Sequence, residues 1–507
     1  TRLRRLGRRH DALLRGARRM VNAAELRDLV AERPEWLLVR ETGGTFPLLS
    51  NEIEVVEEDG KAHFGFIDGA GFHSWRLNGF ELDGNELAVD VAGSFARNRE
   101  TMRLVPRIAA SEITAEIELA RLEKANEIAR MIESSIAGVK LRRVSLNVEN
   151  GRLAQIEFDR DNTPMAAIAD VTATLTAESA LTAAIVWADK LSLRKKRPIN
   201  DLWIVCEKRR SRLAQKLHAL LTERWRAKLT ICEIDRRTEP VRVNELPKRR
   251  IRDLWREKPQ KLIMPARFEP SQTSAWIIGL APDAIDIVFA RNGETLRFHG
   301  LPFARVRAIM GAEKAWFGVG RAMRPLSYDN WDEVVDLVKE LRLMRSFDSP
   351  NKRHEFYRSA SEAWLESILR RNIKLLDANL ILSPIYNQFR FSNDKIDLLA
   401  MRRDGRLVII ELKTQPDREM VFQSIDYWRK IELQRRRGIL ATADLFDGRE
   451  IADRPTIIYL AAPAWSFHRD FEYFAQCVSP DIELWRFDLH EHWRRTIEVI
   501  SRMDYRN

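Results

Sequence analysis

Five residues between positions 397 and 427 have types and spacings that could hydrolyse a phosphodiester bond. Asp397 is followed, after thirteen intervening residues, by Glu411, Lys413 comes two residues later, and Gln423 and Tyr427 lie downstream. Side chains alternate along a strand, so Glu411 and Lys413 would emerge on one face. Two carboxylates and a backbone carbonyl make an all-oxygen site that suits Mg²⁺ or Mn²⁺. The segment therefore predicts metal-assisted hydrolysis, with the lysine beside the attacking water or the phosphate.

Local patterns predict a hairpin that would carry the two acids. The apolar runs Lys395 to Met401 and Arg406 to Leu412 are separated by Arg403-Asp404-Gly405, and an Asp-Gly turn between apolar runs indicates a β-hairpin. Asp397 and Glu411 would then lie on adjacent strands.

Two predicted helices flank this hairpin. Apolar spacing predicts one over Ser359 to Leu376, where Glu362 and Glu366 share a face because they are four residues apart. The other runs from Arg418 to Arg437, ends at Gly438, and places Gln423 and Tyr427 one turn apart.

These motifs resemble the PD-(D/E)xK nuclease superfamily, and most closely the nuclease domain of the NucS/EndoMS type of endonuclease. The resemblance covers about residues 350 to 490 and rests on Ser-Glu-Ala-x-Leu at Ser361, Ile-Asp-Leu-Leu at Ile396, Ile-Ile-Glu-Leu-Lys at Ile409 and Gln-x-x-x-Tyr at Gln423. It implies a restriction-endonuclease-like αβββαβ core. The proline of the superfamily's name is absent, since Lys395-Ile396 precedes Asp397.

The resemblance also implies roles for individual residues. Asp397, Glu411 and the Leu412 carbonyl correspond to metal ligands, and Lys413 to the residue that orients or activates the water. Glu362 corresponds to a helix glutamate of the metal site, with Glu366 as the fallback. Gln423 and Tyr427 correspond to residues that complete the site and meet the nucleic-acid backbone. Taken singly, each of these residues is equally typical of a solvated surface.

Composition bounds the protein class. The chain has 507 residues, 45% of them hydrophobic and 31% charged, which predicts a soluble globular protein of two to four domains. The alternation of predicted helices and strands indicates the α/β class. No apolar run approaches the length of a membrane span, and no signal peptide is visible. Three widely spaced cysteines argue against zinc knuckles and a disulfide framework, so we expect a cytoplasmic protein.

Positive charge is concentrated in one segment. Between Lys190 and Lys261 there are 23 Lys and Arg against 9 Asp and Glu, within a chain whose net charge is +11. Such a surface attracts nucleic acid by counterion release, although a solvated helix face or a basic linker remains the alternative. The predicted nucleic-acid-binding residues are Arg194, Lys195, Lys196, Arg197, Lys208, Arg209, Arg210, Lys248, Arg249 and Arg250.

Residues 107–238 echo the order of elements in the C-terminal domain. We expect a degenerate, nuclease-like α/β copy, with a chance echo of alternating helices and strands as the alternative. The alignment sets Glu157 on Asp397, Asp170 on Glu411, Thr172 on Lys413, and Ala183 and Trp187 on Gln423 and Tyr427. A copy without the lysine would be inactive but could still bind DNA.

The remaining predicted segments carry less information. Residues 1–20, with eight arginines, are predicted to be a basic arm or a non-native extension, and residues 21–106 a β-rich module. Residues 239–270 are predicted to be a basic, proline-containing linker. Residues 271–349 would form a small α+β module before the nuclease domain at 350–507. The β-rich modules could dock a protein partner, mediate a homodimer or bind single strands.

The sequence therefore predicts a Mg²⁺- or Mn²⁺-dependent DNA endonuclease. The resemblance implies branched, mismatched or single-strand-containing DNA as the substrate, in repair or defence. Two alternatives stay open: a non-catalytic nucleic-acid-binding or scaffold subunit that uses a nuclease fold, and an RNA nuclease or a nuclease of a mobile element or of phage defence. No phosphate-binding loop for ATP is present.

Overall fold

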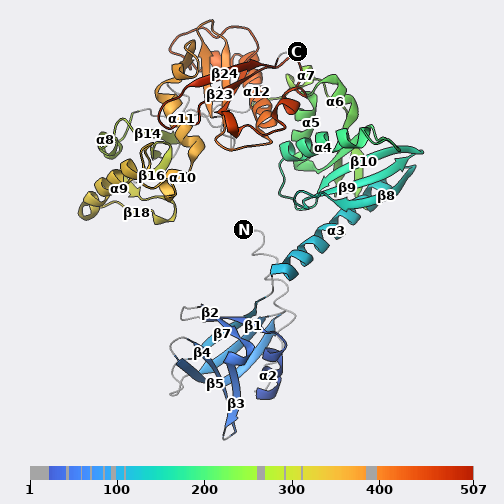
Figure 1. Ribbon diagram of the computed structural model, residues 1–507, viewed down its shortest axis with the longest axis vertical. Helices are drawn as coiled ribbons and strands as arrows, with labels where there is room; N and C mark the ends of the chain where they lie inside the picture. Colours follow the sequence, from blue (N-terminus) through green and yellow to red (C-terminus); the bar gives the residue numbers. More distant parts are fainter. Residues whose placement is uncertain are drawn as a thin grey trace. The chain divides into compact units, whose positions relative to one another are not determined.

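The computed structural model describes residues 22–40, 45–58, 60–68, 71–83, 86–92, 99–107, 110–259, 269–290, 293–309, 312–383 and 397–505. The chain separates into two compact units, Thr1–Ala120 and Arg121–Asn507, and each is described by itself (Figure 1). Four sheets with helices confirm the expectation of a mixed α/β, multi-domain chain. The arm predicted at residues 1–20 lies outside the described residues.

The first unit is a seven-stranded antiparallel sheet with one helix packed on it. Its strands are β1 (Glu35–Arg40), β2 (Thr45–Leu49), β3 (Ile53–Glu58), β4 (Lys61–Asp68), β5 (Gly71–Asp83), β6 (Glu86–Ala92) and β7 (Arg99–Pro106), in the order β2-β1-β7-β6-β5-β4-β3. Helix α2 (Ala23–Ala31) begins at Asn22, whose side chain accepts hydrogen bonds from the N–H groups of Ala24 and Glu25. The helix buries Leu26 and Val30 against the sheet.

A first α/β domain follows. Its elements are α3 (Ala110–Ser135), β8 (Val139–Leu146), β9 (Leu153–Arg160), β10 (Thr163–Asp170), α4 (Ala177–Ser192), β11 (Asp201–Glu207), α5 (Lys208–Ala219), α6 (Glu223–Lys228), β12 (Leu229–Asp235) and β13 (Arg242–Glu245). Alternate residues of β10 face opposite sides of the sheet: Ala167 packs with α3, and Ile168 packs with α4 and α5.

Two details of this domain differ from the sequence prediction. The predicted linker at 239–270 begins instead with β13, which pairs with β12 as the edge strand of the sheet. The segment from Arg209 to Arg226, whose apolar spacing predicts a single helix, forms two helices, because Leu221 and Thr222 between α5 and α6 leave the helical conformation and bond to another segment.

The small module before the C-terminal domain is a five-stranded antiparallel sheet. It comprises α8 (Gln272–Gly279), β14 (Ile285–Ala290), β15 (Gly293–Phe298), β16 (Leu301–Ile309), β17 (Ala312–Phe317), β18 (Arg324–Pro325) and α9 (Trp331–Met344), and α10 (Glu355–Arg358) follows. Arg345, at the end of α9, is fully buried, and its guanidinium donates hydrogen bonds to the main-chain carbonyls of Phe298, His299, Phe356, Ser359 and Ala360. These bonds fasten the module to the beginning of the next helix.

The C-terminal domain is a second α/β domain. Its elements are α11 (Ser361–Arg371), β19 (Leu380–Leu382), β20 (Leu398–Arg402), β21 (Leu407–Leu412), α12 (Met420–Arg436), α13 (Ile439–Thr442), β22 (Ile457–Pro463), α14 (Phe471–Ala475), β23 (Glu483–Leu489) and β24 (Val499–Asp504). The sheet order is β19-β20-β21-β22-β23-β24, and the β21-β22 and β22-β23 pairs are parallel.

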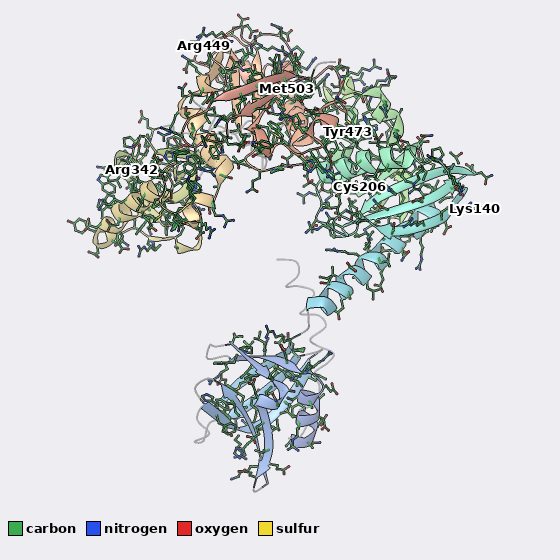
Figure 2. All side chains as sticks on the ribbon, viewed as in Figure 1. Lys140, Cys206, Arg342, Arg449, Tyr473 and Met503 are labelled. Carbon is green, nitrogen blue, oxygen red and sulfur yellow. The ribbon has the colours of Figure 1, made fainter. Side chains whose placement is uncertain are left out.

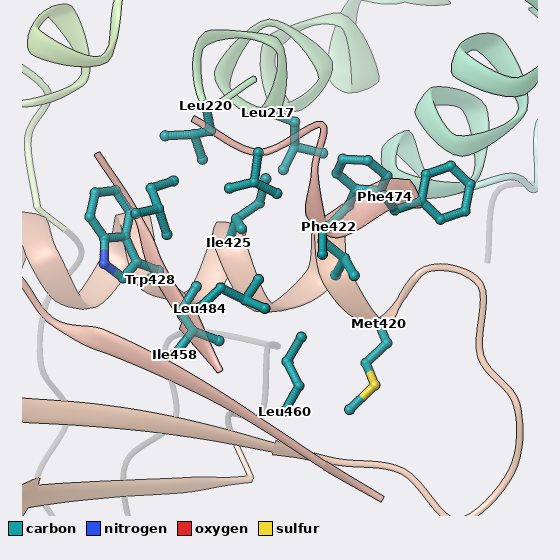
Figure 3. Packing of buried hydrophobic residues seen from close by; sticks show 14 of the residues in the cluster. Leu217, Leu220, Met420, Phe422, Ile425, Trp428, Ile458, Leu460, Phe474 and Leu484 are labelled. Carbon is teal, nitrogen blue, oxygen red and sulfur yellow. The ribbon is translucent and has the colours of Figure 1, made fainter. Parts of the chain in front are cut away.

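The two α/β domains share one hydrophobic core. Leu217 and Leu220 of the first domain lie against Phe422, Ile425 and Trp428 of α12, which in turn cover Ile458 and Leu460 of the sheet (Figure 3). Tyr473 of α14 lies where the two domains meet and contacts Trp225 edge to face, with ring centroids 6.4 Å apart (Figure 2). A continuous apolar core of this kind holds the two domains as one body.

Across the described ranges, every helix is too short or too polar to span a membrane.

Candidate functional site

The residues predicted to do chemistry converge on one cavity of about 780 Å³, called here the Glu411 cavity. Its lining includes Glu362 at the start of α11, Asp397 before β20, Glu411 and Lys413 at the end of β21, and Gln423 and Tyr427 on α12. Four separate elements therefore bring together all six of the side chains predicted from the sequence. Ile396, which belongs to the same motif, lies outside the described residues.

The hairpin predicted around Asp404-Gly405 positions the two acids. The register pairs Leu398 with Ile410, which sets Asp397 opposite Glu411 on the neighbouring strand. Oδ2 of Asp397 accepts a hydrogen bond from the N–H of Leu412 at 2.9 Å. The N–H and C=O of one strand residue point to the same side, so the Leu412 carbonyl is directed towards Asp397 as well.

Glu411 is buried and incompletely bonded. Only 3% of the residue is exposed, and its Oε2 has no hydrogen-bond partner among the described residues. Burial raises the pKa of this carboxyl well above its usual value and the nearby Asp397 raises it further, while Lys413 opposes both effects. A buried oxygen without a donor, next to a second carboxylate, is a position where a cation would lower the energy.

Lys413 is held by three oxygen atoms. Its Nζ lies 3.0 Å from Oε1 of Gln423, 3.2 Å from Oε1 of Glu411 and 3.0 Å from Oδ2 of Asp417. Burial lowers the pKa of this amine, but Glu411 and Asp417 outweigh burial, so the net shift is upward. The lysine is thus an ammonium that donates hydrogen bonds. Asp417, which sequence reasoning missed, is one of the acids that keep it charged.

Helix α11, which places Glu362 at the cavity, begins directly after a residue with a left-handed backbone conformation. Ala360, the residue before the helix, has a left-handed backbone with φ 49°, and its carbonyl accepts a hydrogen bond from buried Arg345. Glu362, in the first turn, is exposed and lines the cavity. The fallback residue Glu366 is buried and paired with Arg370 at 2.6 Å, and it does not line the cavity.

The first α/β domain contributes to the wall of the same cavity, which sequence reasoning did not foresee. Glu178 from α4 and Arg209 and Arg210 from α5 line it. Burial raises the pKa of Glu178 to about 7, and the carboxylates of Asp426 and Glu419 add to that shift. The sequence did mark both arginines as nucleic-acid-binding, without indicating that they face the catalytic candidates.

A second cavity, of about 440 Å³, adjoins the first and is called here the Arg494 cavity. Ser361 and Thr414, the chain neighbours of Glu362 and Lys413, line it, and their hydroxyls are 2.6 Å apart. Its other lining residues are Lys352, Arg353, Tyr357, Arg358, Gln415, Trp493 and Arg494. Four of the lining side chains are basic and none is acidic, so the cavity favours anions. Three of these basic residues lie between positions 352 and 358, separated in part by uncharged and acidic residues, and Arg494 is far away in the sequence, so no long run of positive charge marks the group.

The predicted basic residues do not form one patch. Lys195 and Lys196 are exposed in the loop before β11, whereas Lys208, Arg209 and Arg210 follow that seven-residue strand, so about 20 Å separates the two groups. Arg194 and Arg197 are paired with Glu157 and Asp159.

The group from Lys248 to Arg250 is largely engaged with the protein itself. Lys248 donates to the Ala227 carbonyl and Arg249 pairs with Glu257, while the backbone N–H of Arg250 bonds to Asp253.

The oxygen atoms at the Glu411 cavity are of the type that hard cations prefer as ligands, but they are few. Within the described ranges, no cluster of three or more His, Cys, Asp or Glu side chains is arranged to hold a metal ion. Asp397, Glu411 and the Leu412 carbonyl supply two carboxylates and one carbonyl, and Mg²⁺ commonly takes its remaining ligands from water and phosphate. Comparisons with protein-family models, with curated proteins and with solved structures found no match for the chain.

Proposed function

We propose that this protein is a metal-dependent endonuclease that hydrolyses phosphodiester bonds of DNA. One observation carries the proposal: side chains from four elements converge on a single cavity in which the buried Oε2 of Glu411 has no hydrogen-bond donor in the described structure. A purely structural glutamate at this depth would be expected to have each oxygen bonded, because an unsatisfied buried oxygen is costly.

The chain's own residues divide the work. Asp397, Glu411 and the Leu412 carbonyl would hold a divalent cation, and that cation would supply water activation and charge compensation at the phosphate. Lys413, fixed by Gln423 and Asp417, presents an ammonium that donates a hydrogen bond to the attacking water or to a phosphate oxygen. Because its pKa is raised, Lys413 serves as a donor in this scheme and not as a base.

The basic surroundings support a polyanionic substrate. Arg209 and Arg210 stand on one wall of the Glu411 cavity, and the Arg494 cavity begins one residue away from both Glu362 and Lys413. A basic cavity beside the Glu411 cavity suits a substrate that carries more than one phosphate. Backbone contacts of this kind hold nucleic acid without reading its sequence.

Conservative substitution of the two acids tests the proposal. Asp397→Asn and Glu411→Gln keep the side-chain shapes but remove the charges that hold the cation, so DNA cleavage with Mg²⁺ or Mn²⁺ should fall by at least about 100-fold. DNA binding without metal should stay within about twofold of wild type, because neither acid contacts the backbone in this scheme. Cleavage of plasmid and branched DNA on gels, and fluorescence anisotropy, measure the two effects.

Matched controls are available on the same domain. Asp447→Asn and Glu450→Gln make the same chemical changes at exposed positions away from the cavity, and both should cut normally. Wild-type protein that binds DNA but leaves it intact with every divalent cation would instead favour the non-catalytic scaffold. Cutting of RNA in preference to DNA would transfer the proposal to the RNA nuclease.

A further inference from the structure

The two α/β domains have the same topology. In both, a helix precedes three antiparallel strands, and a second helix leads to a strand that pairs in parallel with the third. A further helical segment then leads to another parallel strand, and an antiparallel edge strand completes the sheet. The orders β8-β9-β10-β11-β12-β13 and β19-β20-β21-β22-β23-β24 therefore match strand for strand. A six-stranded mixed sheet with identical order and orientation is a much stronger sign of duplication than alternating helices and strands.

Equivalent segments of the two domains contact each other reciprocally. The segment that follows α5 bonds to the segment that follows α14: Thr222 N–H donates to the Cys477 carbonyl at 2.9 Å, and Ser479 N–H donates to the Leu220 carbonyl at 2.8 Å. The residues that precede α4 and α12, Thr176 and Glu419, also bond to each other at 2.8 Å. In a two-fold symmetric dimer, the same segment of each copy contacts its counterpart in the other copy. The two domains are therefore related to each other like the subunits of such a dimer.

The first copy has no counterpart of the unbonded Glu411 oxygen among the described residues. Asp170 ends β10, and both of its oxygens are satisfied: Oδ1 accepts from the N–H and the hydroxyl of Thr172, each at 2.8 Å, and Oδ2 accepts from Leu175 N–H at 3.0 Å and from Arg210. The register pairs Asp170 with Leu153, so an apolar side chain stands where Asp397 faces Glu411. The corresponding cavity is only about 120 Å³.

The inactive site and the Glu411 cavity are neighbours. Thr176, Ala177 and Arg210 line both, and Arg209 lines the Glu411 cavity. A duplex at Glu411 therefore also meets the first copy.

We propose that the chain is an internal pseudo-dimer with one working centre, and that it cuts a single strand of duplex DNA. The inference rests on the proposed function. The first copy occupies the surface that a second catalytic copy would need for the same two-fold arrangement, and it contributes Arg209 as a phosphate contact. The second strand of a bound duplex then faces a site without a free carboxylate oxygen.

Cleavage of supercoiled plasmid distinguishes the outcomes. With Mg²⁺ or Mn²⁺ and excess plasmid, open circles should accumulate first, and linear DNA should follow only after a lag, once nicks on opposite strands coincide. Linear DNA formed from the first turnover, without an open-circular phase, would overturn the single-strand inference while leaving the nuclease proposal standing. No conversion of the plasmid to either form, together with no cleavage of branched DNA, would overturn the nuclease proposal and the inference with it.

A pair of substitutions on one helix tests the contribution of the first copy. Arg209 and Arg212 are both exposed on α5, but only Arg209 lines the Glu411 cavity. Arg209→Ala should weaken metal-free duplex binding by about fivefold, and Arg212→Ala should leave it unchanged. Equal affinity for both variants and for wild type would show that the first copy does not touch the substrate and would overturn this part of the inference.

Discussion

Glu178 is a titratable carboxyl on the wall of the Glu411 cavity. Its protonation should make the free energy of unfolding depend on pH. Burial raises its pKa from 4.5 to about 7. The folded protein thus holds this proton more tightly than the unfolded chain, so its stability falls as pH rises from about 4.5 to 7. Glu178→Gln removes that loss. The melting temperature of the variant should match wild type at pH 5 and exceed it by about 1–3 °C at pH 8.

The size of this effect follows from the partial exposure of Glu178. A shift from 4.5 to about 7 in a fully buried group would correspond to roughly 3 kcal/mol, and solvent screening at the cavity wall reduces it to about 1–2 kcal/mol. Glu450→Gln, at an exposed position, is the control and should show no pH-dependent difference. If the difference in melting temperature between wild type and Glu178→Gln is the same at pH 5 and pH 8, the raised pKa of Glu178 is refuted.

Glu411 and Asp170 illustrate how bonding partners decide what a buried acid can do. Asp170 receives two N–H groups, a hydroxyl and a guanidinium, which leaves no oxygen for an added ion. Glu411 receives only Lys413 on Oε1, and its Oε2 is unbonded within the described structure. The same residue class at the end of equivalent strands is therefore closed in one copy and open in the other.

Helix α11 depends on the close approach of the preceding module. Gly300 has φ +80°, and a Cβ there would overlap the backbone of Ala363 in the first turns of α11. Gly300→Ala should therefore destabilise the protein by about 2–5 kcal/mol, combining left-handed strain with overpacking. Because the displaced turn carries Glu362, cleavage should fall as well, even at temperatures where the variant remains folded. Thermal unfolding and plasmid cleavage measure the two consequences.

Gly279→Ala provides the matched control. Gly279 ends α8 in the same module, has no left-handed backbone angle, and has open space where its Cβ would be. The substitution should be neutral or slightly stabilising. Normal stability and activity in Gly300→Ala would mean that the module does not position α11.

Local elements were predictable from the sequence, and contacts between distant elements were not. The Asp-Gly hairpin and the helix carrying Gln423 and Tyr427 follow from turn chemistry and apolar spacing, which are local properties. That Glu178 would line the same cavity as Asp397, Glu411 and Lys413, more than two hundred positions away, depends on packing between domains, which leaves no periodic signal.

The alignment of the two copies failed in its details for a related reason. Glu157 was aligned with Asp397, but it pairs with Ala166, and Leu153 is the partner of Asp170. The hairpin of the first copy is longer and turns at Asp161 and Asn162, which both have positive φ, so an alignment that keeps nearly equal spacing between the two acids shifts the register.

The helix positions shifted in the same way. Ala183 and Trp187 were aligned with Gln423 and Tyr427. Counted from the residues before each helix, Thr176 and Glu419, the equivalents are Ala180 and Ala184.

At the scale of the whole molecule, the distribution of charge matters more than its sum. The segment from Lys190 to Lys261 is strongly basic, but much of its charge is paired with nearby acids or lies at the far end of β11 from the Glu411 cavity. The basic side chains that line the two cavities are Arg209 and Arg210 from this segment, together with Lys413, Lys352, Arg353, Arg358 and Arg494 from outside it. Folding thus brings two arginines of the basic segment into the same region as basic residues that belong to no long run of positive charge.

This distribution predicts which charges control the salt dependence of DNA binding. Arg353 and Arg358 line the Arg494 cavity, so Arg353→Ala with Arg358→Ala should reduce the slope of log Kd against log salt by about 1–2, since each phosphate contact adds roughly one released counterion. Lys195→Ala with Lys196→Ala removes the same charge from an exposed loop away from both cavities and should leave the slope unchanged. Fluorescence anisotropy titrations from about 50 to 250 mM KCl measure both slopes. A larger change in the lysine variant would place the DNA on the loop before β11 and away from the Glu411 cavity.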